Sequence, residues 1–380
     1  NAVSRLMDLS PGLRDQGIHG FNGALVGCAG AALANSGSIA DAGMITLLVA
    51  LGGGLTTLIL ELWRRRFFRR GDPPALTLPF CLITWCLLAL LNPASPAPIE
   101  MIQPAATTDP LKAFLLGIPH SFGQVFLCSK LASGCLVLLA VVLASPMAAA
   151  LGIIGAMVGM TSALAQGADP AAVAQGLWGY NSLLVAIALG GIFHTPGVRS
   201  LLLALAGAGL VTFLQALQSS VISSLPPLTL SFVLTTWLLQ GLAGRALPAL
   251  IPVSLHAVVT PEEHRLRFRV TSALLNRFRR KLRQRIAGTS STSGMMPLVD
   301  EVLKSQTQNL FAQLDCNQDG NLSIDELRQA LMKELSSQDS KLCRRSSLDV
   351  QLDATMAAMD LDGDSRVDCS EFGQLILQLQ

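Results

Sequence analysis

Charged residues are scarce in this chain, making up 14% of its 380 residues against 51% that are apolar. With a mean hydropathy of +0.50, such a composition excludes an ordinary soluble globular protein. The eight cysteines follow no regular spacing, so we expect no disulfide framework. The sequence also lacks a nucleophile–base set, a metal-binding histidine cluster and a phosphate-binding loop, and we therefore expect neither an enzyme nor a nucleic-acid partner.

The few charges are distributed unevenly along the chain. Lys/Arg and Asp/Glu number 11 and 8 in residues 1–250, 9 and 2 in residues 251–295, and 7 and 15 in residues 296–380. The small net charge is thus a cancellation between segments with different roles. We expect three parts: a membrane domain over 1–250, a basic segment with a flexible Ser/Thr-Gly linker over 251–296, and an acidic soluble domain over 297–380.

Long apolar stretches recur through the first part. A helix needs about 20 mostly apolar residues to cross a bilayer. Candidate spans are 17–35, 38–60, 75–92, 126–145, 147–166, 176–193, 198–218 and 228–248. Residues 111–124 are shorter and are broken by Gly117, Pro119 and Gly123, which predicts a re-entrant half-helix. The fold class expected is all-α, a polytopic helical bundle with a small soluble α domain.

Clusters of arginine set the expected orientation. The loop from Arg64 to Arg70 and the stretch after residue 264 are strongly basic, so both should lie in the cytosol. Residues 93–110 have no Lys or Arg and should face outward. The number of crossings agrees with these sides only if residues 111–124 do not span the membrane. The same count places the C-terminal domain in the cytosol. We expect the membrane to be the plasma membrane.

Two sequence elements occur twice. Residues 17–26 match residues 176–185 at Gly, Gly, Asn, Leu and Val, and residues 76–85 match residues 228–237 at seven of ten positions. An odd number of predicted crossings separates the copies, so the repeats should be inverted, an arrangement that builds a conduit at the repeat interface. The second repeat extends about 65 residues before its first element and the first only 16. Since the chain opens on Asn1, we expect a fragment whose first repeat lacks a re-entrant segment and two spans.

These motifs resemble those of the urea transporter family. The resemblance rests on Gly123-Gln-Val-Phe126, Gly176-Leu-Trp-Gly-Tyr-Asn-Ser182, Gly190-Gly-Ile-Phe193 and the Pro-x-x-Thr-x-Pro-Phe element ending at Phe80. It implies a homotrimer in which each protomer conducts urea passively between two inverted halves. The scarcity of charge inside the spans agrees with passive permeation, because ionisable groups in mid-membrane mark ion relays and pumps.

The resemblance also implies roles for single residues. Phe21 and Tyr180 would flatten the slot, Leu25, Leu127 and Leu184 would form its walls, Thr77 and Thr229 would supply central hydroxyls, and Gln124 would lie at the mouth. Three residues depart from the family pattern: Pro73, Ser231 in place of the proline found at Pro79, and Lys130, which could add a positive charge near a mouth. Alternatively, these side chains only pack helices, and the threonines bond their own helix carbonyls.

The acidic domain contains two twelve-residue loops of the EF-hand type. In the first, oxygen ligands for Ca²⁺ stand at positions 1, 3, 5, 7, 9 and 12, with Gly320 at the turn: Asp315, Asn317, Asp319, Asn321, Ser323 and Glu326. The second offers Asp360, Asp362, Asp364, the backbone of Arg366, and Glu371, but has Ser365 where glycine is usual, which should weaken binding. We expect Ile324 and Val367 to pair as a short ribbon between the loops.

Two hypotheses follow. In the first, a urea channel is regulated by calcium bound to the EF-hands. The basic amphipathic segment 265–285 would then contact the EF-hands in a calcium-dependent way or lie on membrane lipid; alternatively, it is only a basic cytosolic tether. In the second, the membrane part is a non-conducting anchor for a calcium sensor or buffer.

Overall fold

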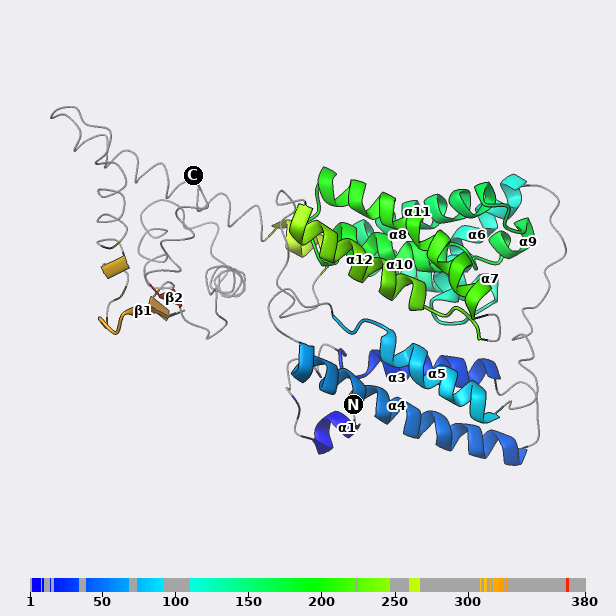
Figure 1. Ribbon diagram of the computed structural model, residues 1–380, viewed down its shortest axis with the longest axis horizontal. Helices are drawn as coiled ribbons and strands as arrows, with labels where there is room; N and C mark the ends of the chain where they lie inside the picture. The colour runs from blue at the N-terminus through cyan, green and yellow to red at the C-terminus, as the bar shows by residue number, and fades with distance from the viewer. Residues whose placement is uncertain are drawn as a thin grey trace. The chain divides into compact units, whose positions relative to one another are not determined.

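The computed structural model describes residues 2–7, 9, 14, 17–33, 39–67, 74–91, 110–222, 225–246, 260–266, 308, 311–312, 315, 317–323, 325–326 and 367–368. The chain divides into two compact units, residues 1–264 and 265–380. Apart from turns and loops, the described residues form helices and one pair of two-residue strands (Figure 1), which confirms the all-α fold class.

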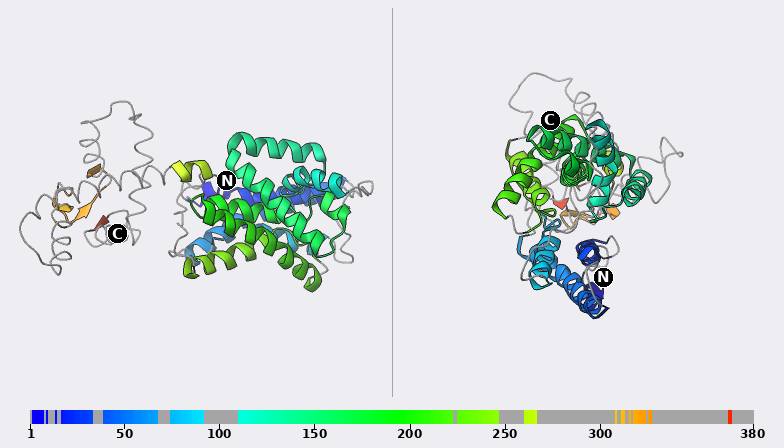
Figure 2. Two further views of the ribbon diagram at one scale, coloured as in Figure 1. Left: turned by 90° about the horizontal axis from the view of Figure 1, so that it is seen from above. Right: turned by 90° about the vertical axis from the view of Figure 1, so that its right-hand side faces the viewer.

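The helices of the first unit follow the two sequence repeats. The first group contains α1 (Ala2–Leu6), α3 (Phe21–Leu33), α4 (Ile39–Phe67) and α5 (Leu78–Leu91). The second contains α6 (Pro110–Gln124), α7 (Leu131–Ala144), α8 (Pro146–Ala165), α9 (Pro170–Ala174), α10 (Tyr180–Ile187), the π-helix η2 (Ala188–Ile192), α11 (Val198–Val221) and α12 (Leu230–Ala246). Helices pack mainly within their own group, and the groups meet where α5 contacts α12 (Figures 1 and 2).

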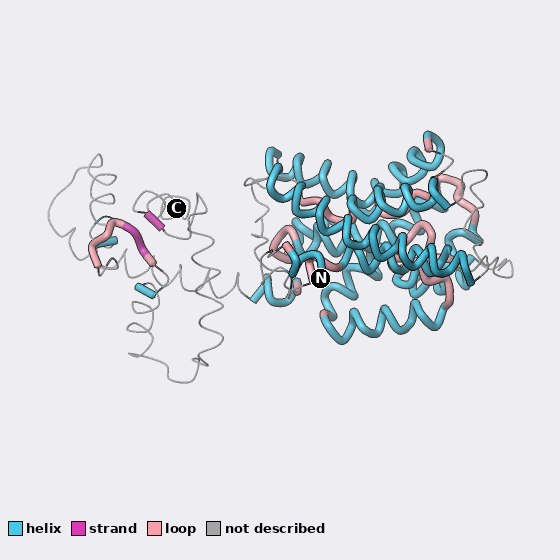
Figure 3. The backbone as a smooth tube through the Cα atoms, turned by 90° about the horizontal axis from the view of Figure 1, so that it is seen from below, coloured by secondary structure: helices cyan, strands magenta, loops and turns pink. Residues whose placement is uncertain are grey.

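A helix is present at every predicted span. Within α4, α8 and α11, stretches of 24, 20 and 24 residues are long and apolar enough to cross a membrane, while α3, α5, α7, α10 with η2, and α12 are shorter apolar helices. The span predicted to start at residue 126 begins as a helix only at Leu131, because residues 125–127 form a turn and residues 128–130 have no regular secondary structure. Similarly, α5 and α12 each begin directly after a turn. Figure 3 shows in pink the loops and turns that join the helices of the first unit.

The predicted half-helix corresponds to α6. It has 15 residues with Pro119 inside, and it packs against α7, α8 and α9. These contacts are close: a Cβ added to Gly134 of α7 would lie 2.2 Å from the Pro119 carbonyl oxygen, and one added to Gly117 would lie 2.7 Å from the Val173 carbonyl oxygen. Protein therefore encloses this short, continuous helix on several sides, as a non-spanning segment requires.

Glycines bring α8 and α10 together. A Cβ added to Gly155 would lie 2.4 Å from the Ala186 Cβ, and one added to Gly159 would lie 2.0 Å from the Ser182 Oγ. Small residues permit such close helix contacts in membranes, where the gain comes from van der Waals packing. Since α10 carries Tyr180 and Leu184, this contact fixes the helix on which two predicted site residues lie.

In the second unit, β1 (Asn321–Leu322) pairs antiparallel with β2 (Val367–Asp368). The register opposes Leu322 to Val367 and Asn321 to Asp368. The predicted pairing of Ile324 with Val367 is therefore wrong in its first residue. Counted from Asp315, the eighth loop position is Leu322, whose side chain is buried with that of Val367.

Candidate functional site

The two matched threonines meet in the buried interior of the first unit. Thr77 and Thr229 stand directly before the first residues of α5 and α12, and their hydroxyl oxygens are 2.7 Å apart in a hydrogen bond. Both side chains are buried, with 8% and 3% of their surfaces exposed. A pair of hydroxyls contributed by two repeats thus lies in the protein interior and does not face lipid.

The backbone around each threonine repeats as well. Leu76 and Leu228 precede the threonines and have φ values of +51° and +46°. A left-handed conformation costs a non-glycine residue about 1–2 kcal/mol, so each needs support from its surroundings. In each repeat an asparagine supplies it: Asn22 donates to the Leu76 carbonyl and Asn181 to the Leu228 carbonyl, both at 3.1 Å.

Tryptophans join the repeats reciprocally. The indole N–H of Trp85 donates to the Pro226 carbonyl at 3.0 Å, and that of Trp237 donates to the Pro74 carbonyl at 2.8 Å. Trp85 and Trp237 are equivalent positions of the two repeats, and so are Pro74 and Pro226. The two bonds therefore obey an approximate twofold relation. The Trp63 ring stacks on Trp237 at a centroid distance of 5.2 Å, which adds a contact on one side.

The predicted wall residues divide between two hydrophobic clusters. Leu25 is buried in the cluster of the first repeat, where Leu127 and Leu228 of the second repeat also pack. Leu184 packs at the cluster of the second repeat, together with Leu76 of the first. Each repeat therefore inserts the leucine before its threonine into the core of the other.

The aromatic pair is less symmetric. Tyr180 is buried, and its hydroxyl donates a short hydrogen bond to the Leu228 carbonyl. Phe21, its repeat counterpart, is 38% exposed. The structure thus brings Tyr180 to the threonine junction through Leu228 and leaves the ring of Phe21 partly open.

Gln124 is the last residue of α6. Its side-chain amide donates to the Gln175 carbonyl at 3.1 Å, which ties the end of α6 to the segment before α10. The glycine between that segment and α10, Gly176, has φ +73° and lies against the His120–Ser121 backbone of α6. Its counterpart Gly17 has φ +78°, so this turn too occurs in both repeats.

Sequence reasoning missed Cys81. Its sulfur lies 3.4 Å from the Thr229 hydroxyl oxygen, and its side chain is fully buried. The signal was present in the spacing, since residue 81 follows Thr77 by four positions and shares its helix face. Val233 stands at the equivalent position of the second repeat, so the thiol makes the junction asymmetric.

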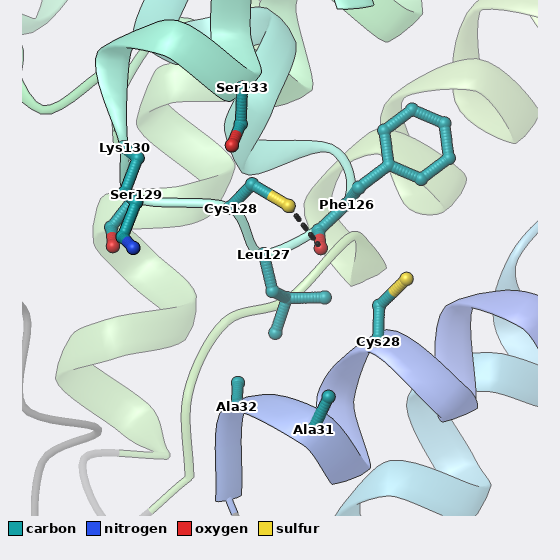
Figure 4. Close-up of a pocket in the computed structure, with 9 residues that line it drawn as sticks. All are labelled: Cys28, Ala31, Ala32, Phe126, Leu127, Cys128, Ser129, Lys130 and Ser133. Carbon is teal, nitrogen blue, oxygen red and sulfur yellow. Dashed lines mark hydrogen bonds between the residues drawn. The ribbon is translucent and has the colours of Figure 1, made fainter. Parts of the chain in front are cut away.

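Lys130 lies at a cavity of about 300 Å³. The cavity lies between the C-terminal part of α3 and the turn that follows α6, and its lining comprises Cys28, Ala31, Ala32, Phe126, Leu127, Cys128, Ser129, Lys130 and Ser133 (Figure 4). Lys130 is also the residue before α7, whose first turn it leaves without a side-chain cap. The predicted positive charge therefore borders a hollow beside Leu127.

In the second unit, the first EF-hand loop holds its carboxylates together. Asp315 accepts from the N–H groups of Asp319 and Gly320, at 3.2 and 2.9 Å. Glu326, at the other end, accepts from the N–H of Asn317 at 3.1 Å and that of Ser323 at 2.9 Å. Both acidic side chains are buried, and Gly320 has the positive φ of +81° that the turn demands.

The donor set fits a hard cation. Burying two carboxylates on one loop is unfavourable unless a cation or several donors compensate, and Ca²⁺ takes six to eight oxygens of this kind. Asp360, Asp362, Asp364, Arg366 and Glu371 of the second loop lie outside the described residues, as does Ile324. The pairing of Val367 with Leu322 nevertheless joins the two loop sequences.

The two repeats of apolar helices define an integral membrane protein. The EF-hand loop sequences add a domain of the calcium-binding class. The family model "Urea transporter" matches residues 1–244, and the family model "EF-hand domain pair" matches residues 304–377. The chain belongs to the urea transporter family and carries an EF-hand pair C-terminal to it.

Curated relatives agree with this assignment. The chain is 29% identical over 266 residues to urea transporter 1 of Ovis aries and to that of Capra hircus. It is 29% identical over 260 residues to urea transporter 1 of Rattus norvegicus. Each alignment covers 66% of this chain and 67% of the relative.

Proposed function

We propose that the membrane part conducts urea passively and selectively between its two repeats, and that calcium binding to the C-terminal domain regulates it. The observation that carries the first claim is the buried hydrogen bond between the Thr77 and Thr229 hydroxyls, one from each repeat. Relatives bearing the name urea transporter support the substrate.

The chemistry of this junction suits urea. Urea is flat and neutral, and it presents two NH₂ groups and one carbonyl. A selective conduit has to replace its water with a few oxygens between apolar walls, without charge that would bind ions. Thr77 and Thr229 would exchange their mutual bond for bonds to urea, Leu25, Leu127 and Leu184 would exclude water, Phe21 and Tyr180 would favour a planar solute, and Gln124 would receive urea at the mouth.

Passive transport follows from the scarcity of ionisable groups. Residues 200–244, which include most of α11 and α12, carry no charge. An ion-coupled transporter needs ionisable or ion-coordinating groups in mid-membrane. We expect the flux to rise linearly with the urea gradient and to need no sodium or proton gradient.

Calcium would be held by the oxygens of Asp315, Asn317, Asp319 and Glu326 and the carbonyl of Asn321, and by the corresponding residues of the second loop. Bound calcium would neutralise the clustered carboxylates, and in sensor-type domains this opens the helix pair. The basic segment 265–285 is the contact we propose for the opened module. We also propose a homotrimer in the plasma membrane, with this domain in the cytosol.

Permeation is tested by stopped-flow urea efflux from proteoliposomes that contain the full chain. We expect efflux well above that of protein-free vesicles. Thr77→Val and Thr229→Val should each lower it about fivefold, because each loses a hydrogen bond worth about 1 kcal/mol in a dry site. Thr235→Val is the matched control, since this buried hydroxyl already donates to the Ser231 carbonyl at 2.7 Å. Efflux equal to empty vesicles would refute the proposal and favour an anchored calcium sensor.

Calcium binding is tested by titration of the purified full chain. Glu326→Gln should weaken binding by about tenfold or more, because position 12 supplies a bidentate charged ligand. Asp325→Asn, which removes the adjacent carboxylate from a non-ligand position, should change the affinity little. Regulation is contradicted if urea efflux is the same in chelator and in millimolar calcium.

A further inference from the structure

Residues 260–266, which follow α12 in the chain, contact the start of α8 through the carboxylate of Glu262. Glu262 accepts two short hydrogen bonds, one from the Ser145 hydroxyl to Oε2 and one from the Met147 N–H to Oε1. Ser145 is the residue before α8, and its hydroxyl oxygen also accepts from the Ala148 N–H at 3.0 Å. At the start of α8, the Met147 N–H is therefore bonded to Glu262 and the Ala148 N–H to Ser145.

The segment that carries Glu262 is held in a defined conformation. Residues 261–266 form a helical turn, which is the yellow segment after α12 in Figure 2. Thr260 caps this turn: its hydroxyl oxygen accepts from the Glu263 N–H at 3.3 Å, and its carbonyl accepts from the His264 N–H at 3.1 Å. A capped turn fixes the direction of the carboxylate toward α8.

The same segment rests on the π-helix η2. A Cβ added to Gly191 would lie 2.6 Å from the Pro261 Cγ, so the proline ring occupies the space over this glycine. In η2 the Phe193 N–H donates to the Ala188 carbonyl at 2.8 Å, five residues back. Such a turn contains one residue more than an α-helical turn, and it frequently marks a functional position.

Helix η2 continues α10 without a break. Tyr180 and Leu184, which belong to the proposed urea path, lie on α10. A displacement of Pro261 from Gly191 would therefore act on the end of the helix that carries these two residues. The chain that follows residue 264 enters the second compact unit, so motion of the calcium-binding domain reaches the membrane unit covalently through residues 260–264.

We propose that residues 260–264 are a docking clip, and that Glu262 is the positioning residue through which the calcium-binding domain acts on α8, η2 and the urea path. This inference rests on the proposed function for its consequence, but the contact can be measured without urea. The clip is a two-state element: docked, with Glu262 on Ser145 and Met147, or released.

A single substitution separates the states. Glu262 presents two acceptor oxygens to two donors, whereas glutamine presents one oxygen and one NH₂ group, so Glu262→Gln loses a bond and places a donor against a donor. Glu263→Gln is the control, because it removes the neighbouring carboxylate and keeps Glu262 with both donors. Gly191→Ala releases the clip by a second route, since its Cβ would overlap the rigid ring of Pro261.

The first measurement is amide hydrogen exchange of the full chain in lipid nanodiscs. Releasing the clip exposes the Met147 amide, so Glu262→Gln and Gly191→Ala should speed its exchange about tenfold or more, and Glu263→Gln should not. In the wild type, millimolar calcium should change this exchange rate relative to chelator. Equal exchange at Met147 in wild type and Glu262→Gln would overturn the docked contact.

The second measurement is urea efflux from proteoliposomes with calcium buffered on both sides. We expect the wild-type efflux to depend on calcium, and we expect Glu262→Gln and Gly191→Ala to conduct at a rate that no longer does. The coupling between the calcium-binding domain and the urea path would be overturned by either of two results. One is a urea efflux that responds to calcium as strongly in both variants as in the wild type. The other is a wild-type Met147 exchange rate that is the same with and without calcium. Absence of urea efflux would refute the proposed function alone, because the exchange measurement would still decide on the clip.

Discussion

At the scale of single residues, Ser231 compensates for an absent proline. In the first repeat, Pro79 is the second residue of α5; its counterpart Ser231 is the second residue of α12. The Ser231 hydroxyl donates to the Gln218 side-chain oxygen at 2.7 Å, and the Gln218 amide donates to the Pro227 carbonyl at 2.9 Å. A side-chain bridge thus fixes the start of α12, where a proline ring does so for α5.

Ser231→Ala should destabilise the protein by about 1–3 kcal/mol, because a buried acceptor on Gln218 loses its donor. Thermal unfolding of the detergent-purified protein measures this loss. Ser220→Ala is the control: this exposed hydroxyl donates to the Leu217 carbonyl within its own helix, and its removal should change stability by less than about 0.5 kcal/mol. Equal melting temperatures for wild type and Ser231→Ala would contradict the bridge.

Glu262 should make the docking clip sensitive to acid. Burial raises the pKa of this carboxyl, but hydrogen bonds from Ser145, Met147 and Thr260 outweigh it, so the pKa lies below its ordinary value of 4.5. A depressed pKa in the folded protein means that the contribution is complete above 4.5 and is lost as the pH falls through the lowered value.

We therefore expect Met147 exchange in wild type to remain slower than in Glu262→Gln at pH 5 and to approach it only at more acidic pH. Comparing the two proteins at each pH cancels the intrinsic pH dependence of exchange. If the difference vanished already near pH 6, the carboxylate would not be held by these donors.

At the scale of elements, the contact between α8 and α10 depends on glycine. Gly159→Ala would place a Cβ 2.0 Å from the Ser182 Oγ and 3.0 Å from the Trp178 carbonyl oxygen. Overpacking of this kind costs about 1–3 kcal/mol. Gly209→Ala on α11 meets nothing within 4 Å and should be neutral or stabilising by up to about 1 kcal/mol, because alanine favours the helix. Melting temperatures that shifted alike in both variants would contradict this.

The sequence predicted elements better than the junctions between them. Every apolar stretch is a helix, because about 20 apolar residues leave the backbone no other way to satisfy its hydrogen bonds in lipid. The repeat identified Thr77 and Thr229 as equivalent positions, and the resemblance to urea transporters predicted that their hydroxyls form a pair. Apolar runs do not report where a helix begins, however, so the predicted span 126–145 includes residues 126–130, which are not helical.

Other parts of the site depend on contacts between distant segments. The left-handed Leu76 and Leu228 are stabilised by asparagines 54 and 47 residues away. Cys81 meets Thr229 across the repeats. Leucine and cysteine are common in apolar helices, so neither residue type indicates such a role in the sequence. The docking of Glu262 on Ser145, across 117 positions, is of the same kind.

At the scale of the whole molecule, contacts join positions that the sequence predicts to lie on one side of the membrane. Ser145 before α8, Gly191 in η2 and Pro261 of the clip come together through the contacts of Glu262 and Pro261. These positions all belong to loops or ends that the arginine distribution predicts to be cytosolic. The loop after α8, around Asp169, should then lie at the opposite surface.

Cysteine labelling tests this orientation. In a variant whose own cysteines are replaced, Gly197→Cys and Asp169→Cys each introduce one thiol at an exposed position; at residue 197 a Cβ would meet only the Thr195 carbonyl oxygen, at 4.0 Å. A membrane-impermeant maleimide applied to intact cells should label Asp169→Cys and not Gly197→Cys, and permeabilisation should make both reactive. An odd number of crossings separates the two positions, because α10 with η2 runs between them.

The reverse labelling pattern would mean that the protein has the opposite orientation in the membrane, with the calcium-binding domain outside the cell. Calcium there is millimolar and nearly constant, so the domain could not regulate urea flux, and Glu262 would then be only a structural cap.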